Sequence, residues 1–575
     1  MAEFEWGIST LTFSGGTAVS LPRGCVLVVI GPNGSGKSTS LHNIEDALTA
    51  RREGHPLSVV TEVRGFHSGD ADSFLRWVEL NHESIDIEGE RGYVTKRGFV
   101  RKTHIDDLLP GRPGFGHVFH AVLVEHLDAE SRLALTNYTR SIEPHSEAPE
   151  AYVHLLQRSD HLLAEASQEV QAAFGVDLII NWGGSSQVGF HVGEEPERTV
   201  ENDRVSTQYL ARLHELARLE HAGDGIRSFV GSLLAALCGA HPVLLIDEPE
   251  AFLHPPQAKR LGRALGAISR ERDRQFILAT HSTDLLQGAI SGGAAVVVCR
   301  ITRQGSETQA SVLQSEEIRE LWAKPLMRSS AAIDGLFHEG VVVCEGDSDA
   351  RFYEALMRHL DRSGTLGRPA DVFFVHGNGK GGVPALTSSY RRLAVRTATI
   401  VDLDILRDDG QLERVLSSHG IAYNAHLHGQ MNRIRNELGA ANPTRPLEEF
   451  TSAVSDVLGG AAGQSSLGSN ERRRLIELIE DSSSWSEVKR YGLGKLVGGG
   501  RRELEEILAA WAQTGLFVVP RGDLEGWWPR GSRDKNAWFV EALDVLETNP
   551  AELQDSLTFV EKVHAWLSNG GPSSG

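Results

Sequence analysis

Acidic side chains follow two apolar runs in the second half of the chain, and their spacing suits the binding of divalent cations. Glu345 follows the run 341–344 and Asp349 lies four residues later, while Asp402 and Asp404 lie at the end of the run 398–403. Crowded carboxylates repel one another unless cations neutralise them. Oxygen ligands favour Mg²⁺ or Mn²⁺ over Zn²⁺. Such a site could activate water and stabilise the departing oxygen of a phosphodiester.

The segments that must position these acids alternate between strands and helices. Strands are expected at 341–344, 371–375, 398–403 and 516–520, with helical segments between them. This alternation predicts a parallel sheet, whose functional groups gather at the carboxyl ends of the strands. Asp523 and Glu525 follow the last of these strands, and Lys535 lies just before a predicted helix.

A second constellation lies near the start of the chain. The apolar run 25–30 predicts a buried strand and leads into GPNGSGKS and then a helical segment. In this pattern backbone N–H groups surround the phosphates, a lysine reaches the β and γ oxygens and a hydroxyl binds magnesium. It predicts an ATP site formed by Gly31, Asn33, Gly34, Gly36, Lys37, Ser38 and Thr39.

Two later segments supply further groups for nucleotide chemistry. The run 242–250, PVLLIDEPE, ends in Asp247, which is placed to hold magnesium, and Glu248, which is placed to polarise the attacking water. The run 275–279 leads into His281. This order resembles the ATP-binding-cassette ATPases, which implies that His281 senses the γ-phosphate. The resemblance also suggests a signature at 223–228, just before a helix expected from residue 229. There the Ser228 hydroxyl would face the γ-phosphate of the nucleotide bound by a partner head, so that the ATP site is completed in a homodimer.

Composition bounds the remaining possibilities. A chain of 575 residues should divide into at least two domains, and a net charge of −20 argues against a passive basic wrapper of nucleic acid. Four cysteines without metal-ligand spacing indicate a reduced, cytoplasmic protein. Neither a secretory signal nor a membrane span is predicted. The most apolar window, 230–246, is interrupted by polar residues, glycine and proline, which indicates a helix followed by a buried strand.

A strand ending in Glu-Gly, followed later by Asp-x-Asp, resembles the TOPRIM domain of topoisomerases, primases and certain nucleases. The late Asp523 and Lys535 make the chain similar to nucleases of the overcoming-lysogenization-defect (OLD) family, including the Gabija-type defence subunit, over nearly its whole length. The resemblance implies catalytic roles for Glu345, Asp404 and Lys535, with Lys562 as a competing lysine. It implies metal ligation by Glu345, Asp349, Asp402, Asp404 and Asp523, assisted by Glu525.

We therefore expect an α/β protein with two domains. An ATP-binding-cassette-type P-loop head at 1–335 would carry helical and antiparallel arms at about 50–220, and a Rossmann-like TOPRIM domain at 336–575 would carry a helical insertion at about 410–515. The expected activity is ATP-regulated, metal-dependent cleavage of DNA in anti-phage defence by a homo-oligomer, with an operon-encoded protein as a further partner. A ribonuclease acting on tRNA and an ATP-driven DNA-binding or repair scaffold remain alternatives.

Overall fold

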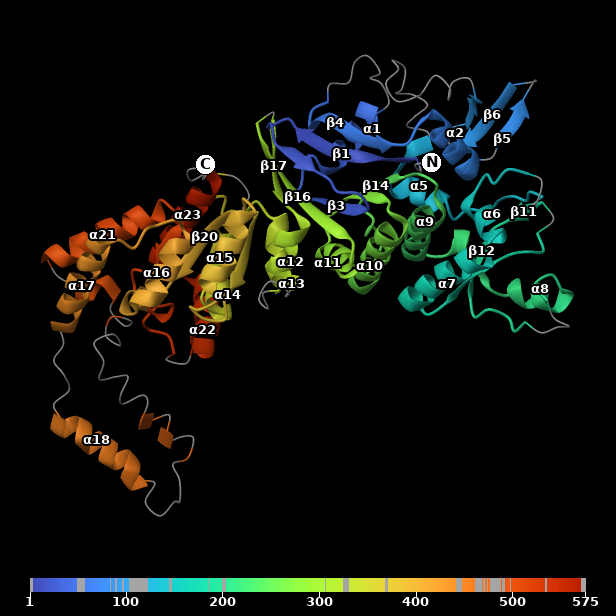
Figure 1. The fold of residues 1–575 in the computed structure, drawn as a ribbon. Helices are drawn as coiled ribbons and strands as arrows, with labels where there is room; N and C mark the ends of the chain where they lie inside the picture. The colour runs from blue at the N-terminus through green and yellow to red at the C-terminus, as the bar shows by residue number, and fades with distance from the viewer. Residues whose placement is uncertain are drawn as a thin grey trace. The chain divides into compact units, whose positions relative to one another are not determined.

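The chain folds into two compact units, Met1–Ala323 and Lys324–Gly575, a division slightly N-terminal to the predicted boundary. They are seen in a computed structural model (Figure 1). It describes residues 4–48, 57–82, 84–87, 90–95, 98–102, 122–143, 147–184, 186–198, 203–305, 307–323, 330–367, 371–440, 447–460, 468, 471–472, 474–475, 488, 492–496, 498–532 and 535–569. None of the described helices is long and apolar enough to cross a membrane.

The N-terminal unit is built on a six-stranded sheet. In sheet order its strands are β17 (Glu307–Leu313), β16 (Ala295–Gln304), β3 (Cys25–Ile30), β15 (Gln275–Ala279), β14 (Val243–Asp247) and β8 (Val124–Leu127). All neighbours pair in parallel except β16 and β17. Every residue of β3 is buried, as its continuous apolar sequence predicts.

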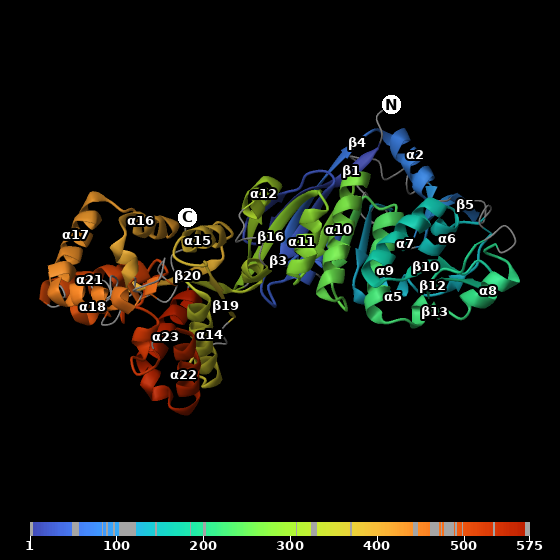
Figure 2. The same ribbon diagram turned by 90° about the horizontal axis from the view of Figure 1, so that it is seen from below.

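Different layers cover the two faces of this sheet (Figures 1 and 2). One face carries α1 (Lys37–Leu48) and an antiparallel sheet of β1 (Glu5–Phe13), β2 (Ala18–Ser20) and β4 (Val60–Ser68). The other carries α9 (Asp224–Cys238), α10 (Pro255–Arg272) and α11 (Thr283–Ser291). The predicted helix and strand within 230–246 are the end of α9 and β14, so this prediction is confirmed.

The predicted arms contain both helices and antiparallel strands. The first part of this region contains α2 (Ala71–Asn81) and the sheet of β5 (Ser84–Ile87), β6 (Glu90–Thr95) and β7 (Gly98–Arg101). Further along the chain come α5 (Ala129–Ala134), β9 (Thr139–Arg140), α6 (Tyr152–Gln157), α7 (Asp160–Phe174), β10 (Asp177–Ile180), β11 (Gln187–Val188), β12 (Phe190–Gly193), α8 (Thr207–Leu213) and β13 (Ala217–Arg218). The unit ends with α12 (Ser315–Ala323).

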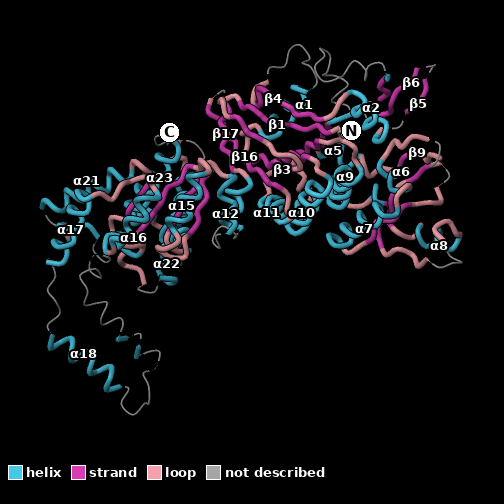
Figure 3. The backbone as a smooth tube through the Cα atoms, in the orientation of Figure 1, coloured by secondary structure: helices cyan, strands magenta, loops and turns pink. Residues whose placement is uncertain are grey.

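The C-terminal unit contains the predicted parallel sheet (Figure 3). In sheet order its four strands are β19 (Val372–His376), β18 (Gly340–Cys344), β20 (Arg396–Val401) and β21 (Leu516–Val518), and all neighbours are parallel. The central strand β18 is buried throughout. The segments that follow these strands therefore emerge at one edge of the sheet.

Helices cover both faces of this second sheet (Figure 2). A core lies between the sheet and the helices α14 (Asp347–Arg362), α22 (Lys535–Thr548) and α23 (Gln554–Asn569). It includes Val342 and Cys344, which are two residues apart on β18 and therefore face the same side of the sheet. α15 (Val383–Arg392) lies on the opposite face and packs against α16 (Asp409–Ser418). The insertion before β21 continues with α17 (Ala425–Ala440), α18 (Leu447–Gly460) and α21 (Gly498–Ala512).

His419 joins the end of α16 to this sheet and makes its stability sensitive to acid. Its ring nitrogens lie 2.9 Å from Thr399 Oγ1 and 3.1 Å from the Thr514 carbonyl oxygen. Burial lowers the pKa of His419 to about 4. The unfolded chain binds a proton at this histidine near pH 6.5. The free energy of unfolding should therefore decrease as pH falls from about 6.5 to 4, by about 3 kcal/mol.

Calorimetric unfolding of the C-terminal unit at several pH values measures this loss. His419→Gln should unfold with a shallower dependence on pH in the acidic range than the unmodified protein. The matched control is His428→Gln, at a half-exposed side chain on α17, which should retain the full dependence. Equal acid sensitivity in both variants would contradict the role of His419.

Candidate functional sites

The carboxyl ends of β18 and β20 bring three acids together. Glu345 follows β18, and its Oε1 accepts a hydrogen bond of 3.0 Å from the backbone N–H of Asp402, which follows β20. The chain then turns into the short helix η4 (Leu403–Arg407), which contains Asp404. One carboxylate oxygen from each of Glu345, Asp402 and Asp404 lies within 4.8 Å of the other two. Residues 57 positions apart in the chain therefore share one site, as predicted for this edge of the sheet.

Burial makes this acid cluster unfavourable in its fully charged form. Glu345 and Asp404 are each only 9% exposed. Burial, with the nearby charges of Asp404 and Asp349, raises the pKa of Glu345 to about 7. Burial raises the pKa of Asp402 well above its usual value, and the nearby charges add to this rise; they are those of Glu345, Asp349, Asp404 and Asp523. A divalent cation would relieve this repulsion, and the oxygen-only donor set fits Mg²⁺ or Mn²⁺.

A lysine that the sequence analysis did not select also belongs to this site. Lys380 forms an ion pair with Asp404, and its positive charge opposes the rise in the pKa of Glu345. It lies in the loop after β19, where the Gly379 N–H donates to the Glu345 carbonyl oxygen at 2.8 Å. A basic residue within the glycine-rich segment 377–382, directly after a predicted strand, was the signal that could have identified it.

Asp349 and Lys535 form a separate pair beside the three acids. Lys535, at the first turn of α22, places Nζ 3.1 Å from Asp349 Oδ1. Asp349 Oδ2 accepts a hydrogen bond of 2.8 Å from Gly346 N–H at the start of α14. Burial lowers the pKa of Lys535, but the charges of Asp349, Glu525 and Asp402 raise it overall. Asp349 thus has protein partners for both oxygens and lies outside the three-acid group.

The remaining predicted residues, Asp523, Glu525 and Lys562, are not members of the three-acid group. Asp523 follows β21, and its negative charge contributes to the raised pKa of Asp402. Its Oδ1 accepts a hydrogen bond of 3.1 Å from Gly526 N–H. Glu525 begins the short helix η6 (Glu525–Trp527) and acts electrostatically on Lys535. Lys562 is exposed on α23, whereas Lys535 contacts one of the predicted acids.

The N-terminal unit forms a phosphate-binding loop between β3 and α1. Gly31, Gly34 and Gly36 have φ values of 149°, 73° and 100°, which side chains with a Cβ rarely adopt. A Cβ on Gly31 would lie 2.2 Å from the Ile301 carbonyl oxygen, so this position also requires glycine for space. The polar side chains of Asn33, Ser38 and Thr39 are exposed at the mouth of the loop, and together these features suit a bound phosphate chain.

Two backbone carbonyl oxygens hold the Lys37 side chain at this loop. Its Nζ donates hydrogen bonds of 2.9 Å to the carbonyl oxygens of Gly31 and Pro32. Burial lowers the pKa of Lys37 to about 8, although the nearby acids Glu248 and Asp247 oppose this shift. The Lys37 amine therefore loses its proton at a pH only slightly above neutral. Bound phosphate oxygens would favour its charged form.

The end of β14 brings the predicted acids to the same loop. Ser38 Oγ donates to Asp247 Oδ1 at 3.1 Å, so the two predicted magnesium-binding side chains are in contact. Glu248 is half-exposed and has a φ of 46°. His281 Nε2 lies 4.0 Å from Glu248 Oε1, and the backbone N–H of His281 donates to Glu250 Oε1 at 2.8 Å. Burial and then the charge of Lys37 lower the pKa of His281.

Ser228 lies in a different environment from the one predicted. α9 begins at Asp224, earlier than expected, so Ser228 is within the helix and its side chain is fully buried. Its Oγ accepts a hydrogen bond of 3.2 Å from Arg132 Nε. The prediction that this hydroxyl faces a nucleotide is therefore wrong for the described fold. The start of the helix was misplaced because Gly223 provides no side-chain cap to mark it.

Arg132 is a further residue that sequence reasoning missed. It is fully buried on α5, and its guanidinium donates to the carbonyl oxygens of Asp247 and Glu248. The same group contacts Ser228, so one side chain connects α5, α9 and the end of β14. Because its partners at β14 are backbone carbonyls, no residue pattern indicated this contact.

Comparisons with known proteins match both units. A family described as "AAA domain, putative AbiEii toxin, Type IV TA system" matches residues 180–287, and one described as "Overcoming lysogenization defect protein-like, TOPRIM domain" matches residues 336–404. Protein ea59 of Escherichia phage lambda is 30% identical over 93 residues, covering 16% of this chain and 18% of that protein. The chain thus matches less than a fifth of this curated relative.

Two solved structures are similar to part of the chain. The SMC head domain from Thermotoga maritima is 12% identical, with a TM-score of 0.28, and the match covers 54% of this chain and 98% of that one. The Smc head domain from Pyrococcus furiosus, with an extended coiled coil and bound to the C-terminal domain of ScpA, is 12% identical with a TM-score of 0.30. That match covers 56% of this chain and 99% of that one.

Proposed function

We propose that this chain, which joins a P-loop ATPase domain to an OLD-like TOPRIM domain, is an ATP-regulated endonuclease that cuts DNA with Mg²⁺ or Mn²⁺. One observation carries the proposal: three acidic side chains from two neighbouring strand ends lie within 4.8 Å of one another. Buried carboxylates in this arrangement are suited to cations rather than to structural packing. The family matches favour a role in defence against phage.

The residues of the acid site divide into two kinds. Glu345, Asp402 and Asp404 would hold the metal, which would supply Lewis acidity toward water and toward the departing oxygen. Lys380 contacts Asp404 in this site, and Lys535 contacts Asp349 beside it. Once a cation reduces the negative charge, these lysines are available to bind the oxygens of the scissile phosphate. Two basic side chains beside a metal site suit a nucleic-acid backbone.

The ATPase domain would regulate this activity through its own site. Lys37 would bind the β- and γ-phosphates, Asp247 and Ser38 would hold the magnesium that accompanies ATP, and Glu248 would polarise the attacking water. His281 lies beside Glu248 and is suited to contact the γ-phosphate. ATP-binding-cassette-type heads complete such sites by pairing, so we propose a homodimer as the active form.

Cleavage assays with purified protein test the proposal. Supercoiled plasmid and total tRNA are incubated separately with Mg²⁺, Mn²⁺ or excess EDTA, each with and without ATP. We expect the plasmid to be nicked or linearised with either metal and to remain intact in EDTA. Cleavage of tRNA but not of plasmid would show that the substrate is RNA rather than DNA. The absence of any cleavage, with ATP hydrolysis retained, would favour an ATP-driven scaffold instead.

A further inference from the structure

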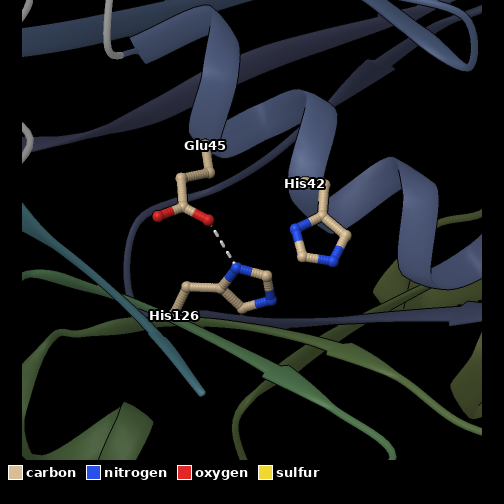
Figure 4. A group of neighbouring side chains, drawn as sticks. All are labelled: His42, Glu45 and His126. Carbon is tan, nitrogen blue, oxygen red and sulfur yellow. Dashed lines mark hydrogen bonds and ion pairs between the residues drawn. The ribbon is translucent and has the colours of Figure 1, made fainter. Parts of the chain in front are cut away.

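A cluster of two histidines and a glutamate lies in the ATPase domain, separate from the groups assigned to the nucleotide. His42 and Glu45 come from α1 and His126 comes from β8 (Figure 4). One candidate ligand atom from each side chain lies within 4.8 Å of the other two. Glu45 Oε2 lies 2.6 Å from His126 Nδ1, and the ring centroids of His42 and His126 are 4.9 Å apart.

The local structure explains why these side chains meet. His42 and Glu45 are three residues apart on α1, so they project from the same side of the helix. β8 is the edge strand of the main sheet, next to β14. α1 packs across this part of the sheet and contacts both β8 and β14. The helix therefore supplies two of the donors and the edge strand the third.

The two nitrogens of the His126 ring have different surroundings. The side chain is only 7% exposed, and Nε2, on the side of the ring away from Glu45, is buried without a hydrogen-bond partner among the described residues (Figure 4). Nδ1 lies 2.6 Å from Glu45 Oε2, so Nδ1 is the nitrogen that shares the cluster with the carboxylate. A cation bound between these two groups would take the place of the proton that joins them.

We propose that His42, Glu45 and His126 form a binding site for a transition-metal cation, with Zn²⁺ as the preferred ion. Two imidazoles and one carboxylate form a donor set typical of Zn²⁺ and unlike the oxygen-only set around Glu345. His42 is exposed, so solvent has access to the cluster and water can complete the tetrahedral coordination. A cation here would fasten the helix that follows the phosphate-binding loop to the edge of the sheet.

A metal site and a simple ion pair predict different effects of replacing His42. A Glu45–His126 pair alone links the same two elements, but it does not need His42. A metal site requires His42 as well, and it binds Zn²⁺ in competition with protons. The contribution of the exposed His42 therefore distinguishes the two arrangements, and its replacement does not disturb the core.

The test measures Zn²⁺ binding to tag-free, full-length protein. Protein is dialysed against buffered micromolar Zn²⁺ with millimolar Mg²⁺, which occupies oxygen-only sites, and bound zinc is counted by mass spectrometry. We expect the unmodified protein to hold one Zn²⁺ that His42→Ala lacks, because losing a ligand should weaken binding by more than the ~100-fold range of outer contacts. His161→Ala, at an exposed histidine on α7, should retain it.

A second measurement separates a specific site from adventitious binding. Zn²⁺ should raise the melting temperature of the unmodified protein and of His161→Ala, but not that of His42→Ala, because a ligand stabilises only the fold that binds it. The proposal is overturned if His42→Ala binds as much Zn²⁺ as the unmodified protein. It is also overturned if the unmodified protein retains no zinc under these conditions.

Discussion

Glu345→Gln is expected to reduce the rate of DNA cleavage by about 1000-fold or more, the scale of losing a central group in a preorganised charged site. Glutamine keeps the shape of the side chain and can still accept the hydrogen bond from Asp402 N–H. It removes the negative charge that would bind the metal. Cleavage of supercoiled plasmid over a range of Mg²⁺ concentrations measures the loss. Excess metal should not restore the full cleavage rate.

The fold should survive this change, because the replaced carboxylate is buried close to Asp404. Removing one of two neighbouring buried charges relieves repulsion, so the melting temperature without metal should stay the same or rise. Glu354→Gln, on the exposed part of α14, is the matched control and should cut normally. If Glu345→Gln protein cuts at the rate of the unmodified protein, the acid cluster is not the cleavage site.

Lys37→Ala is expected to weaken ATP binding by about 100-fold, because the proposed role of the amine is to make charge-assisted hydrogen bonds to two phosphates, each worth about 1.5 kcal/mol or more. Titration calorimetry with ATP at neutral pH measures the change. Lys259→Ala, at an exposed lysine on α10, is the control and should bind normally. Unchanged affinity in Lys37→Ala would place the nucleotide elsewhere.

The pH dependence of binding gives a second test of Lys37. Burial lowers its pKa to about 8, and only the charged amine attracts phosphate strongly. ATP affinity should therefore decrease as pH rises through about 8, whereas Lys37→Ala should lose this dependence. An affinity that stays constant to pH 9 in the unmodified protein would contradict the assignment.

The sequence was most informative where a residue's role depends on a local pattern. The apolar runs predicted β3, β14, β18 and β20, and the rule that parallel strands expose their carboxyl ends together predicted the meeting of Glu345 with Asp402 and Asp404. The glycine pattern of the phosphate-binding loop predicted positions that prove to have positive φ. These features follow from backbone geometry, which short sequence patterns describe well.

Contacts between distant segments were beyond the reach of these patterns. Lys380 approaches Asp404 because the loop after β19 is hydrogen-bonded to the Glu345 backbone, which no periodicity indicates. The pairing of Lys535 with Asp349 spans 186 positions, and it occupies an acid that the sequence assigned to metal. Ser228 was misassigned because a glycine-rich segment can end before a helix or continue into it.

The buried guanidinium of Arg132 has a mechanical implication. It donates to the carbonyl oxygens of Asp247 and Glu248 and also to Ser228, near the start of α9. A planar fork with several fixed partners resists shear between the segments it joins. Any tilt of α9 would thus be transmitted to Glu248, the acid proposed to polarise the attacking water, so we expect this residue and the helix to move together rather than independently.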